Sequence, residues 1–184
     1  MSRKMTLILG GARSGKSSHA QRLAAECAPN VWYVATAAAG DEEMRRRIAA
    51  HQAERPAGWQ TLEAQRGVGP ALLAAAAAQP PAVVLLDCLT LLTSNILLAH
   101  PDETPEQTLQ AALDEELDDL LTAYRSLSAE WFIVSNEVGL GLVPPYPLGR
   151  IYRDLLGRAN QRLAQQADTV LFMVAGLPLK VKGD

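Results

Sequence analysis

The chain has 184 residues, of which 48% are hydrophobic and 20% are charged, and its formal net charge is −3 at pH 7. This composition is typical of an ordinary globular protein, and the length fits a single domain over residues 1–184. The acidic balance argues against nonspecific binding of nucleic acid, because proteins that follow a phosphate backbone carry a basic surface.

Apolar segments of the chain are too short or too interrupted for export or membrane insertion. None reaches the roughly 18 to 20 residues that a membrane span requires, and the N-terminal apolar stretch is too short for a signal peptide. Cys27 and Cys88 lie in apolar segments and are expected to be buried, neither paired nor bound to metal. These features predict a cytoplasmic protein.

Short, continuous apolar runs alternate along the chain with segments of helical spacing. Strands buried on both faces are expected over residues 5–9, 31–35, 83–86, 132–135 and 169–174. Helices are expected over residues 16–28, 42–54, 70–79, 88–99, 104–128 and 148–167. This order predicts an α/β fold of the P-loop NTPase (RecA-like) class, with a mostly parallel sheet flanked by helices. The segment GLPLKVK, from Gly176, is a candidate antiparallel edge strand.

The segment GGARSGKS follows the first expected strand and opens the first expected helix. It matches the phosphate-binding pattern G-x-x-x-x-G-K-S/T in the required context, whereas a chance match in such a chain is on the order of one in a hundred. Glycines let backbone N–H groups converge on phosphate oxygens, and the helix adds its positive N-terminal end. The nucleotide-binding residues predicted here are Gly10, Gly11, Ala12, Arg13, Ser14, Gly15, Lys16 and Ser17. Lys16 is expected to bridge the β- and γ-phosphates, and the Ser17 hydroxyl to bind Mg²⁺.

Asp87 ends the apolar run AVVLLD, where a buried strand leaves the sheet. In a parallel sheet this edge faces the ligand, so Asp87 is a candidate second residue for Mg²⁺. The alternative is that its carboxylate caps the N-terminus of the helix that follows.

His51 shares one stripe of the expected helix over residues 42–54 with Met44 and Ile48, so its ring is expected to point inward. One interpretation is a half-buried imidazole near a helix C-terminus, where a cation is favoured. The other is a nucleophile, because a neutral imidazole can attack phosphorus and form a phosphoramidate. The pattern alone leaves both open.

Six segments together carry a more specific signal: GGARSGKS, YVATA, DEEMRRRIAAHQAERPAGWQTLE, LLDCLT, SNEVGLGLVP and RANQRLAQQAD. In this order they resemble the bifunctional adenosylcobinamide kinase / adenosylcobinamide-phosphate guanylyltransferase family of cobalamin biosynthesis. The resemblance spans nearly the whole chain. The P-loop is shared by many families, but R-I-x-x-H-x-x-x-R-P-x-x-W and N-E-V-G-x-G are much more distinctive.

The resemblance implies two reactions. Adenosylcobinamide is phosphorylated with ATP or GTP, and GMP is then transferred from GTP to that phosphate, giving adenosylcobinamide-GDP and pyrophosphate. In such enzymes the histidine of the R-I-x-x-H motif carries the GMP, and His51 occupies that position. The resemblance also implies a homotrimer and no nucleic-acid partner.

The same resemblance implies nucleotide contacts outside the P-loop. These positions are Ala35, Thr36, Ala37, Gln52, Ala53, Glu54, Arg55, Glu63 and Asp87. Arg55 would place a cation near phosphates, and the Glu63 carboxylate could accept guanine N–H groups. Alternatively, Arg55 is a surface cation and Glu63 a solvated acid at a strand edge.

Two other functions fit the P-loop by itself. One is a plain small-molecule kinase without a covalent histidine step, and the other is a nonenzymatic nucleotide sensor. A Ras-like GTPase is disfavoured, because SNEVGLG stands where such proteins read guanine through N-K-x-D.

Overall fold

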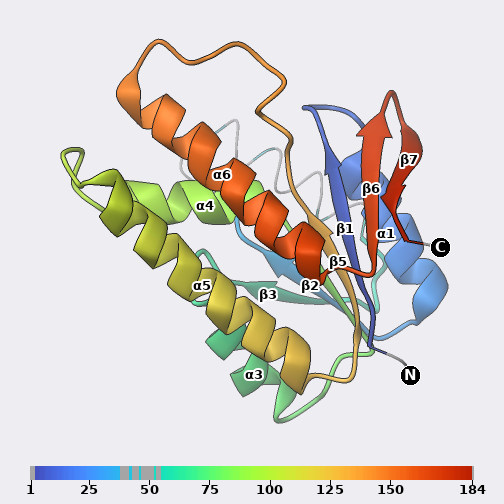
Figure 1. Ribbon diagram of the computed structural model, residues 1–184. Coiled ribbons are helices and arrows are strands. Elements are labelled where there is room, and N and C mark those ends of the chain that lie inside the picture. Colours follow the sequence, from blue (N-terminus) through green and yellow to red (C-terminus); the bar gives the residue numbers. More distant parts are fainter. Residues whose placement is uncertain (1–2, 38–41, 43–45, 47–51, 53–54, 184) are drawn as a thin grey trace.

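The computed structural model describes residues 3–37, 42, 46, 52 and 55–183. They form a seven-stranded sheet in the order β3-β2-β4-β5-β1-β6-β7 (Figure 1). Its strands are β1 (Met5–Gly10), β2 (Val31–Ala35), β3 (Gln60–Glu63), β4 (Val83–Asp87), β5 (Glu130–Val134), β6 (Thr169–Val174) and β7 (Leu177–Lys182). The first six strands in the sheet order, from β3 at the edge to β6, are all parallel to their neighbours. The last strand, β7, runs antiparallel to β6.

Helices cover both faces of the sheet. The described helices are α1 (Lys16–Cys27), α3 (Val68–Ala76), α4 (Leu89–Leu98), α5 (Glu106–Ser126) and α6 (Pro147–Gln166). Buried residues of α1 join a cluster on one face, and those of α3 to α6 join a larger cluster on the other. In Figure 1, α5 and α6 accordingly cross in front of the strands while α1 lies behind them.

Side chains of the central strands alternate between these two clusters. On β4, Val84 and Leu86 enter the larger cluster, whereas Val83 and Leu85 enter the smaller one. Because successive residues of a strand face opposite sides, a strand covered on both sides must be apolar at every position. This accounts for the uninterrupted apolar runs in the sequence.

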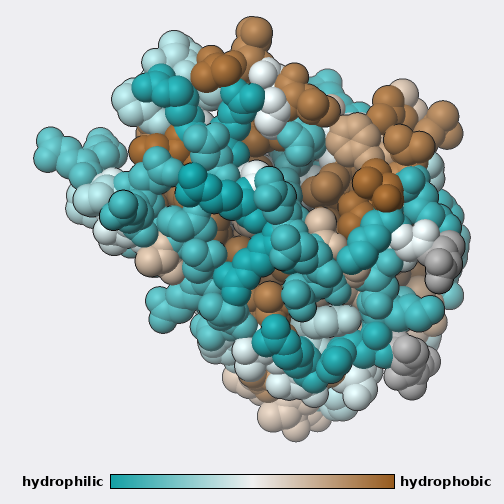
Figure 2. Space-filling model, viewed as in Figure 1, coloured by the Kyte–Doolittle hydropathy of each residue, from teal (hydrophilic) through white to brown (hydrophobic). Residues whose placement is uncertain are grey.

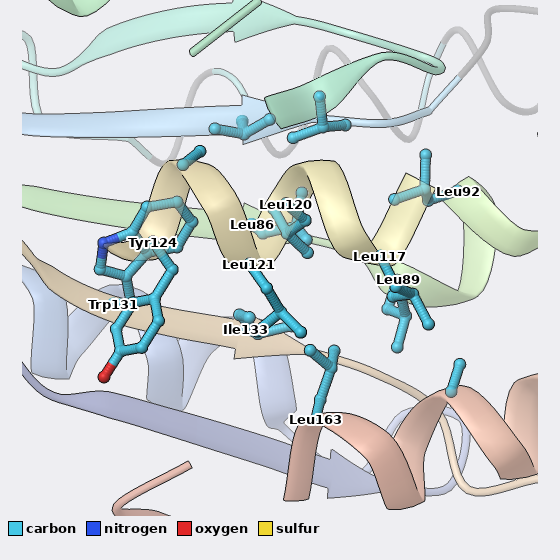
Figure 3. Packing of buried hydrophobic residues seen from close by; sticks show 14 of the residues in the cluster. Leu86, Leu89, Leu92, Leu117, Leu120, Leu121, Tyr124, Trp131, Ile133 and Leu163 are labelled. Atoms are coloured by element: carbon cyan, nitrogen blue, oxygen red, sulfur yellow. The ribbon is translucent and has the colours of Figure 1, made fainter. Parts of the chain in front are cut away.

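The larger cluster is anchored where α5 meets β5. Trp131 is fully buried, and the Tyr124 ring meets it edge to face with a centroid separation of 5.7 Å. Figure 3 shows Leu163 of α6 pointing toward Ile133 of β5, with Leu121 of α5 close by. Three consecutive elements of the chain are thus held together by aromatic and leucine packing.

The structure confirms the mostly parallel α/β architecture and the antiparallel edge strand at Leu177–Lys182. Four of the five expected strands agree with β1, β2, β4 and β6 to within one residue, while β5 begins two residues before the expected range. The expected helix over residues 42–54 lies mostly outside the described residues, although residues 42, 46 and 52 are helical.

Three details differ from expectation. The short strand β3 was not predicted, and α3 begins at Val68, two residues before the expected start. The prediction that both cysteines are buried is wrong for Cys27, which is exposed, while Cys88 is partly buried. Cys27 is the last residue of α1, so its side chain can lie beyond the packed part of the helix. Within the described part of the chain, no helix has the length and apolarity to cross a membrane.

Candidate functional site

The predicted phosphate-binding loop joins β1 to α1 at the carboxyl edge of the sheet. Gly15 stands at the N-cap of α1 with φ of 89°, a left-handed conformation that favours glycine. Lys16 opens the helix, and its Nζ donates a hydrogen bond to the Gly11 carbonyl at 2.6 Å. The loop therefore curls back on itself and gathers backbone N–H groups at the helix N-terminus, where an anion is favoured.

The Lys16 side chain is buried, with 8% of its surface exposed. Burial lowers the pKa of the Lys16 ammonium, and the nearby Cys88 and Asp87 act in the opposite direction. A desolvated ammonium next to converging amides attracts a polyanion strongly, because little water competes for the charge.

The loop rests on the turn between β6 and β7. The Gly176 N–H donates to the Ser14 carbonyl at 3.0 Å. A Cβ at Gly10 would lie 2.7 Å from the Met173 carbonyl oxygen, and one at Gly15 would lie 3.2 Å from Gly176 Cα. Both glycines are thus required by close packing against the hairpin, a support that sequence analysis did not identify.

Asp87 ends β4 beside this loop. Its Oδ2 accepts a hydrogen bond from the Tyr33 hydroxyl at 2.7 Å. Cys88 occupies the N-cap position of α4, and that helix start has no side-chain capping bond. The carboxylate therefore does not cap α4, and the capping interpretation is wrong.

Arg55 packs against the face of the Tyr33 ring. Its guanidinium carbon lies 3.5 Å from the centroid of the Tyr33 ring, and its Nη1 donates to the Thr61 hydroxyl at 3.1 Å. Such cation–π contacts stabilise by about 0.5–2 kcal/mol. Arg55, Tyr33 and Asp87 form a continuous chain of contacts, and Arg55 is partly buried.

The sheet register brings three more predicted positions to the same edge. Ala35 is the register partner of Glu63 on β3 and of Asp87 on β4. Glu63 is exposed there, so its carboxylate is accessible to a ligand. The residue after Ala35 is Thr36, which is fully buried.

Thr36 connects the ends of β2 and β4. Its hydroxyl donates to the Cys88 carbonyl at 2.8 Å and accepts from the Cys88 N–H at 2.9 Å. The Thr36 carbonyl accepts a hydrogen bond from Asn95 Nδ2 at 2.8 Å. The Thr36 side chain is thus fully used in bracing the edge of the sheet.

Only some of the remaining predicted positions lie among the described residues. Gln52 is helical and exposed, and Ala37 is partly buried. His51, Ala53 and Glu54 lie outside the described residues. Sequence analysis missed Tyr33 and Asn95, whose polar atoms hold Asp87 and Thr36 in place.

Among the described residues, no group of three or more His, Cys, Asp and Glu side chains is arranged to hold a metal ion. The Ser17 hydroxyl and the Asp87 carboxylate are oxygen groups of the kind that Mg²⁺ prefers.

A family model described as cobinamide kinase / cobinamide phosphate guanyltransferase matches residues 6–181. The chain belongs to this family. Membership makes it a transferase with both a kinase and a nucleotidyltransferase activity in adenosylcobalamin biosynthesis.

Curated relatives cover the chain almost end to end. The bifunctional adenosylcobalamin biosynthesis protein CobP of Pseudomonas aeruginosa is 47% identical over 178 residues, which is 97% of each chain. The bifunctional adenosylcobalamin biosynthesis protein CobU of Salmonella typhimurium is 43% identical, over 97% of this chain and 99% of its own length. CobU of Escherichia coli is 39% identical over the same shares. The cobinamide kinase / guanyltransferase match therefore extends over the whole fold as well as the P-loop.

Proposed function

We propose that the enzyme first phosphorylates adenosylcobinamide with ATP or GTP and then transfers GMP from GTP to that phosphate through a covalent GMP on His51. The products of the second reaction are adenosylcobinamide-GDP and pyrophosphate. The single observation that carries the proposal is a P-loop geometry at the sheet edge of a chain whose whole length matches this bifunctional family.

In the kinase step, the loop from Gly10 to Ser17 holds the triphosphate. Lys16 neutralises charge that develops on the transferred phosphoryl group, and the loop amides donate to its oxygens. The acceptor hydroxyl forms the new P–O bond and loses its proton, and the bond between the β- and γ-phosphates breaks. Burial of Lys16 supports this role, because it concentrates positive charge at one point.

In the transferase step, a neutral imidazole of His51 attacks the α-phosphorus of GTP. A P–N bond forms and pyrophosphate leaves. An oxygen of the acceptor phosphate then attacks the same phosphorus, and the P–N bond breaks. Each displacement inverts the phosphorus, so the net stereochemical result is retention.

Arg55 supports the participation of the His51 segment. The two are four positions apart in the chain, a separation that even an extended backbone spans in about 14 Å. Arg55 is itself linked through Tyr33 to Asp87 beside the P-loop.

Mg²⁺ is the cofactor that this donor set fits. The Ser17 hydroxyl and the Asp87 carboxylate would hold it, together with phosphate oxygens. When bound, it would neutralise phosphate charge and so make pyrophosphate a better leaving group. The Tyr33 hydrogen bond fixes one Asp87 oxygen and leaves the other available.

Further GTP contacts are proposed at Ala35, Thr36, Ala37, Glu63 and the segment from Gln52 to Arg55. Thr36 is fully buried and its hydroxyl is bonded to Cys88, so Thr36 would act on GTP by positioning its neighbours Ala35 and Ala37. The exposed Glu63 carboxylate can accept guanine N–H groups. We also propose a homotrimeric assembly.

Separate assays of the two reactions test the proposal. His51→Ala should retain phosphorylation of adenosylcobinamide and lose pyrophosphate release from GTP, whereas Lys16→Ala should lower both by about 100-fold or more. His100→Asn is the control, since the His100 ring bonds the Ile96 carbonyl at the end of α4. Unchanged pyrophosphate release in His51→Ala would rule out the covalent route, and turnover of neither substrate by the native protein would favour a nucleotide sensor.

A further inference from the structure

A cavity of about 700 Å³ lies between α6 and the carboxyl ends of β1 and β5. Leu9 and Glu137 line the end nearest the P-loop. The α6 wall carries Arg153, Gly157, Arg158 and Asn160. Of the nucleotide contacts proposed above, none that the structure describes lines this cavity.

Asn160 marks the cavity as a site for a ligand that donates hydrogen bonds. Its side chain is 95% buried, and Nδ2 donates to the Asn136 carbonyl at 3.0 Å. That bond fixes the orientation of the amide and leaves Oδ1, which has no hydrogen-bond partner among the described residues. Buried polar atoms in proteins are nearly always paired, so this oxygen lacks a donor that a bound molecule would supply.

The cavity borders the phosphate-binding loop through Leu9 and Glu137. The Glu137 N–H donates to the carbonyl of Gly10, the first residue of that loop, at 3.0 Å. The Glu137 carboxylate accepts from the Gly139 N–H at 2.6 Å and remains at the cavity surface. A molecule in the cavity can therefore extend a group toward the triphosphate past Glu137.

The charges along the wall favour an occupant that contacts it through neutral polar groups. Glu137 and Asp154 are acidic, while Arg153 and Arg158 are basic, and Arg158 is already paired with Glu106 at 3.2 Å. Balanced charges suit neutral groups that both donate and accept hydrogen bonds, whereas a polyphosphate requires an excess of cations.

Apolar side chains next to the cavity suit a large, partly apolar body. In the loop between β5 and α6, Leu140, Leu142 and Val143 are 81%, 96% and 63% exposed. Figure 2 shows apolar surface over this loop at the top of the molecule, beside the polar face of α6. Exposed apolar residues at the rim of a polar cavity are typical of binding sites.

We infer that this cavity holds the acceptor corrinoid, with a carboxamide N–H donating to Asn160 Oδ1 and the reacting hydroxyl near Glu137. The assignment rests on the proposed function, which supplies a carboxamide-bearing macrocycle as substrate. The loop of Leu140 and Leu142 covers part of the apolar ring.

Gly157 offers a steric test. A Cβ there meets nothing within 4 Å, so a larger side chain can enter the cavity without displacing backbone, and helix propensity favours the replacement. Gly157→Phe and Gly157→Leu should raise the KM for adenosylcobinamide by about tenfold or more. Gln166→Phe places the same ring at an exposed position of α6 outside the cavity and should leave that KM unchanged.

The rate of pyrophosphate release from GTP without corrinoid is measured on the same variants. In each of them this rate should equal that of the native enzyme. An unchanged corrinoid KM in both Gly157 variants would overturn the assignment. A parallel loss of GTP turnover would also overturn it, because the cavity would then hold the nucleotide. A changed sedimentation mass with an unchanged KM would overturn it too, because the cavity would then lie at contacts between copies of the chain. Failure of the native enzyme to use adenosylcobinamide would instead overturn the proposed function.

Discussion

Tyr33 connects two charged groups of the site through one side chain. Its hydroxyl donates to Asp87, and its ring faces the Arg55 guanidinium. Burial, followed by the Asp87 charge, raises the pKa of the Tyr33 hydroxyl far above its usual value. The hydroxyl therefore remains a proton donor at neutral and mildly alkaline pH, and Asp87 remains its acceptor.

Tyr33→Phe removes this donor while keeping the ring under Arg55. Because a hydrogen bond to a charged group contributes about 1.5–3 kcal/mol, we expect a less well ordered Asp87 and a higher Mg²⁺ concentration for half-maximal kinase activity. The shift should be the same from about pH 6 to 9, since the native hydroxyl does not ionise there. Titration of activity with Mg²⁺ measures it.

Tyr152→Phe is the matched control, because its hydroxyl bonds the Thr90 carbonyl at 3.3 Å on the α6 side of the sheet. This variant should need no additional Mg²⁺. An equal increase in both variants, or none in Tyr33→Phe, would contradict a role for Tyr33 in holding Asp87.

At the scale of single residues, sequence analysis could propose Lys16 and Asp87 as site residues, because a strand end and a P-loop have local signatures. It missed Tyr33, which looks like ordinary core within VWYVA. The polar partner of Tyr33 lies 54 residues away in the chain. Pairings at such separations depend on the sheet order, which no local pattern contains.

Among the helices, α3 depends on a residue of α5 for its start. The buried Glu116 carboxylate accepts from the Gly67 and Val68 N–H groups, both at 2.8 Å. A carboxylate at a helix N-terminus satisfies amides that have no partner within the helix and complements its dipole. A Cβ at Gly69 would lie 2.2 Å from the Asp119 carbonyl oxygen, so the two helices are in close contact.

Glu116→Ala should therefore destabilise the fold by about 2–4 kcal/mol, because two buried amides lose a charged acceptor. Denaturant unfolding measures the change in free energy. Glu115→Ala is the control, since Glu115 is the exposed neighbour on the same helix and its loss should cost less than about 0.5 kcal/mol. Similar losses in the two variants would contradict the capping role.

This contact also explains one error at the scale of elements. Pro70 marks a helix start in the sequence, but the helix begins at Val68 because Glu116, which lies 48 residues away from it, satisfies the first amides. The strand β3 was missed for a different reason. It has four residues with alternating exposure, so it lacks the continuous apolar run by which the central strands were identified.

Across the whole molecule, the carboxyl edge of the sheet collects the predicted site residues. Alternating strands and helices were enough to predict that edge, because parallel strands joined by helices end on one side. They did not specify the order β3-β2-β4-β5-β1-β6-β7, which places the β6–β7 turn under the P-loop. The acceptor cavity likewise arises from contact between α6 and strand ends that are distant in sequence.

The central claim is that His51 carries GMP between the two substrates. Intact-protein mass after incubation with GTP and Mg²⁺, without corrinoid, tests it most directly. The native chain should gain one guanylyl group that is labile to acid, and His51→Ala should gain none. An adduct of equal amount on His51→Ala, or no adduct on a native enzyme that still forms adenosylcobinamide-GDP, would contradict it.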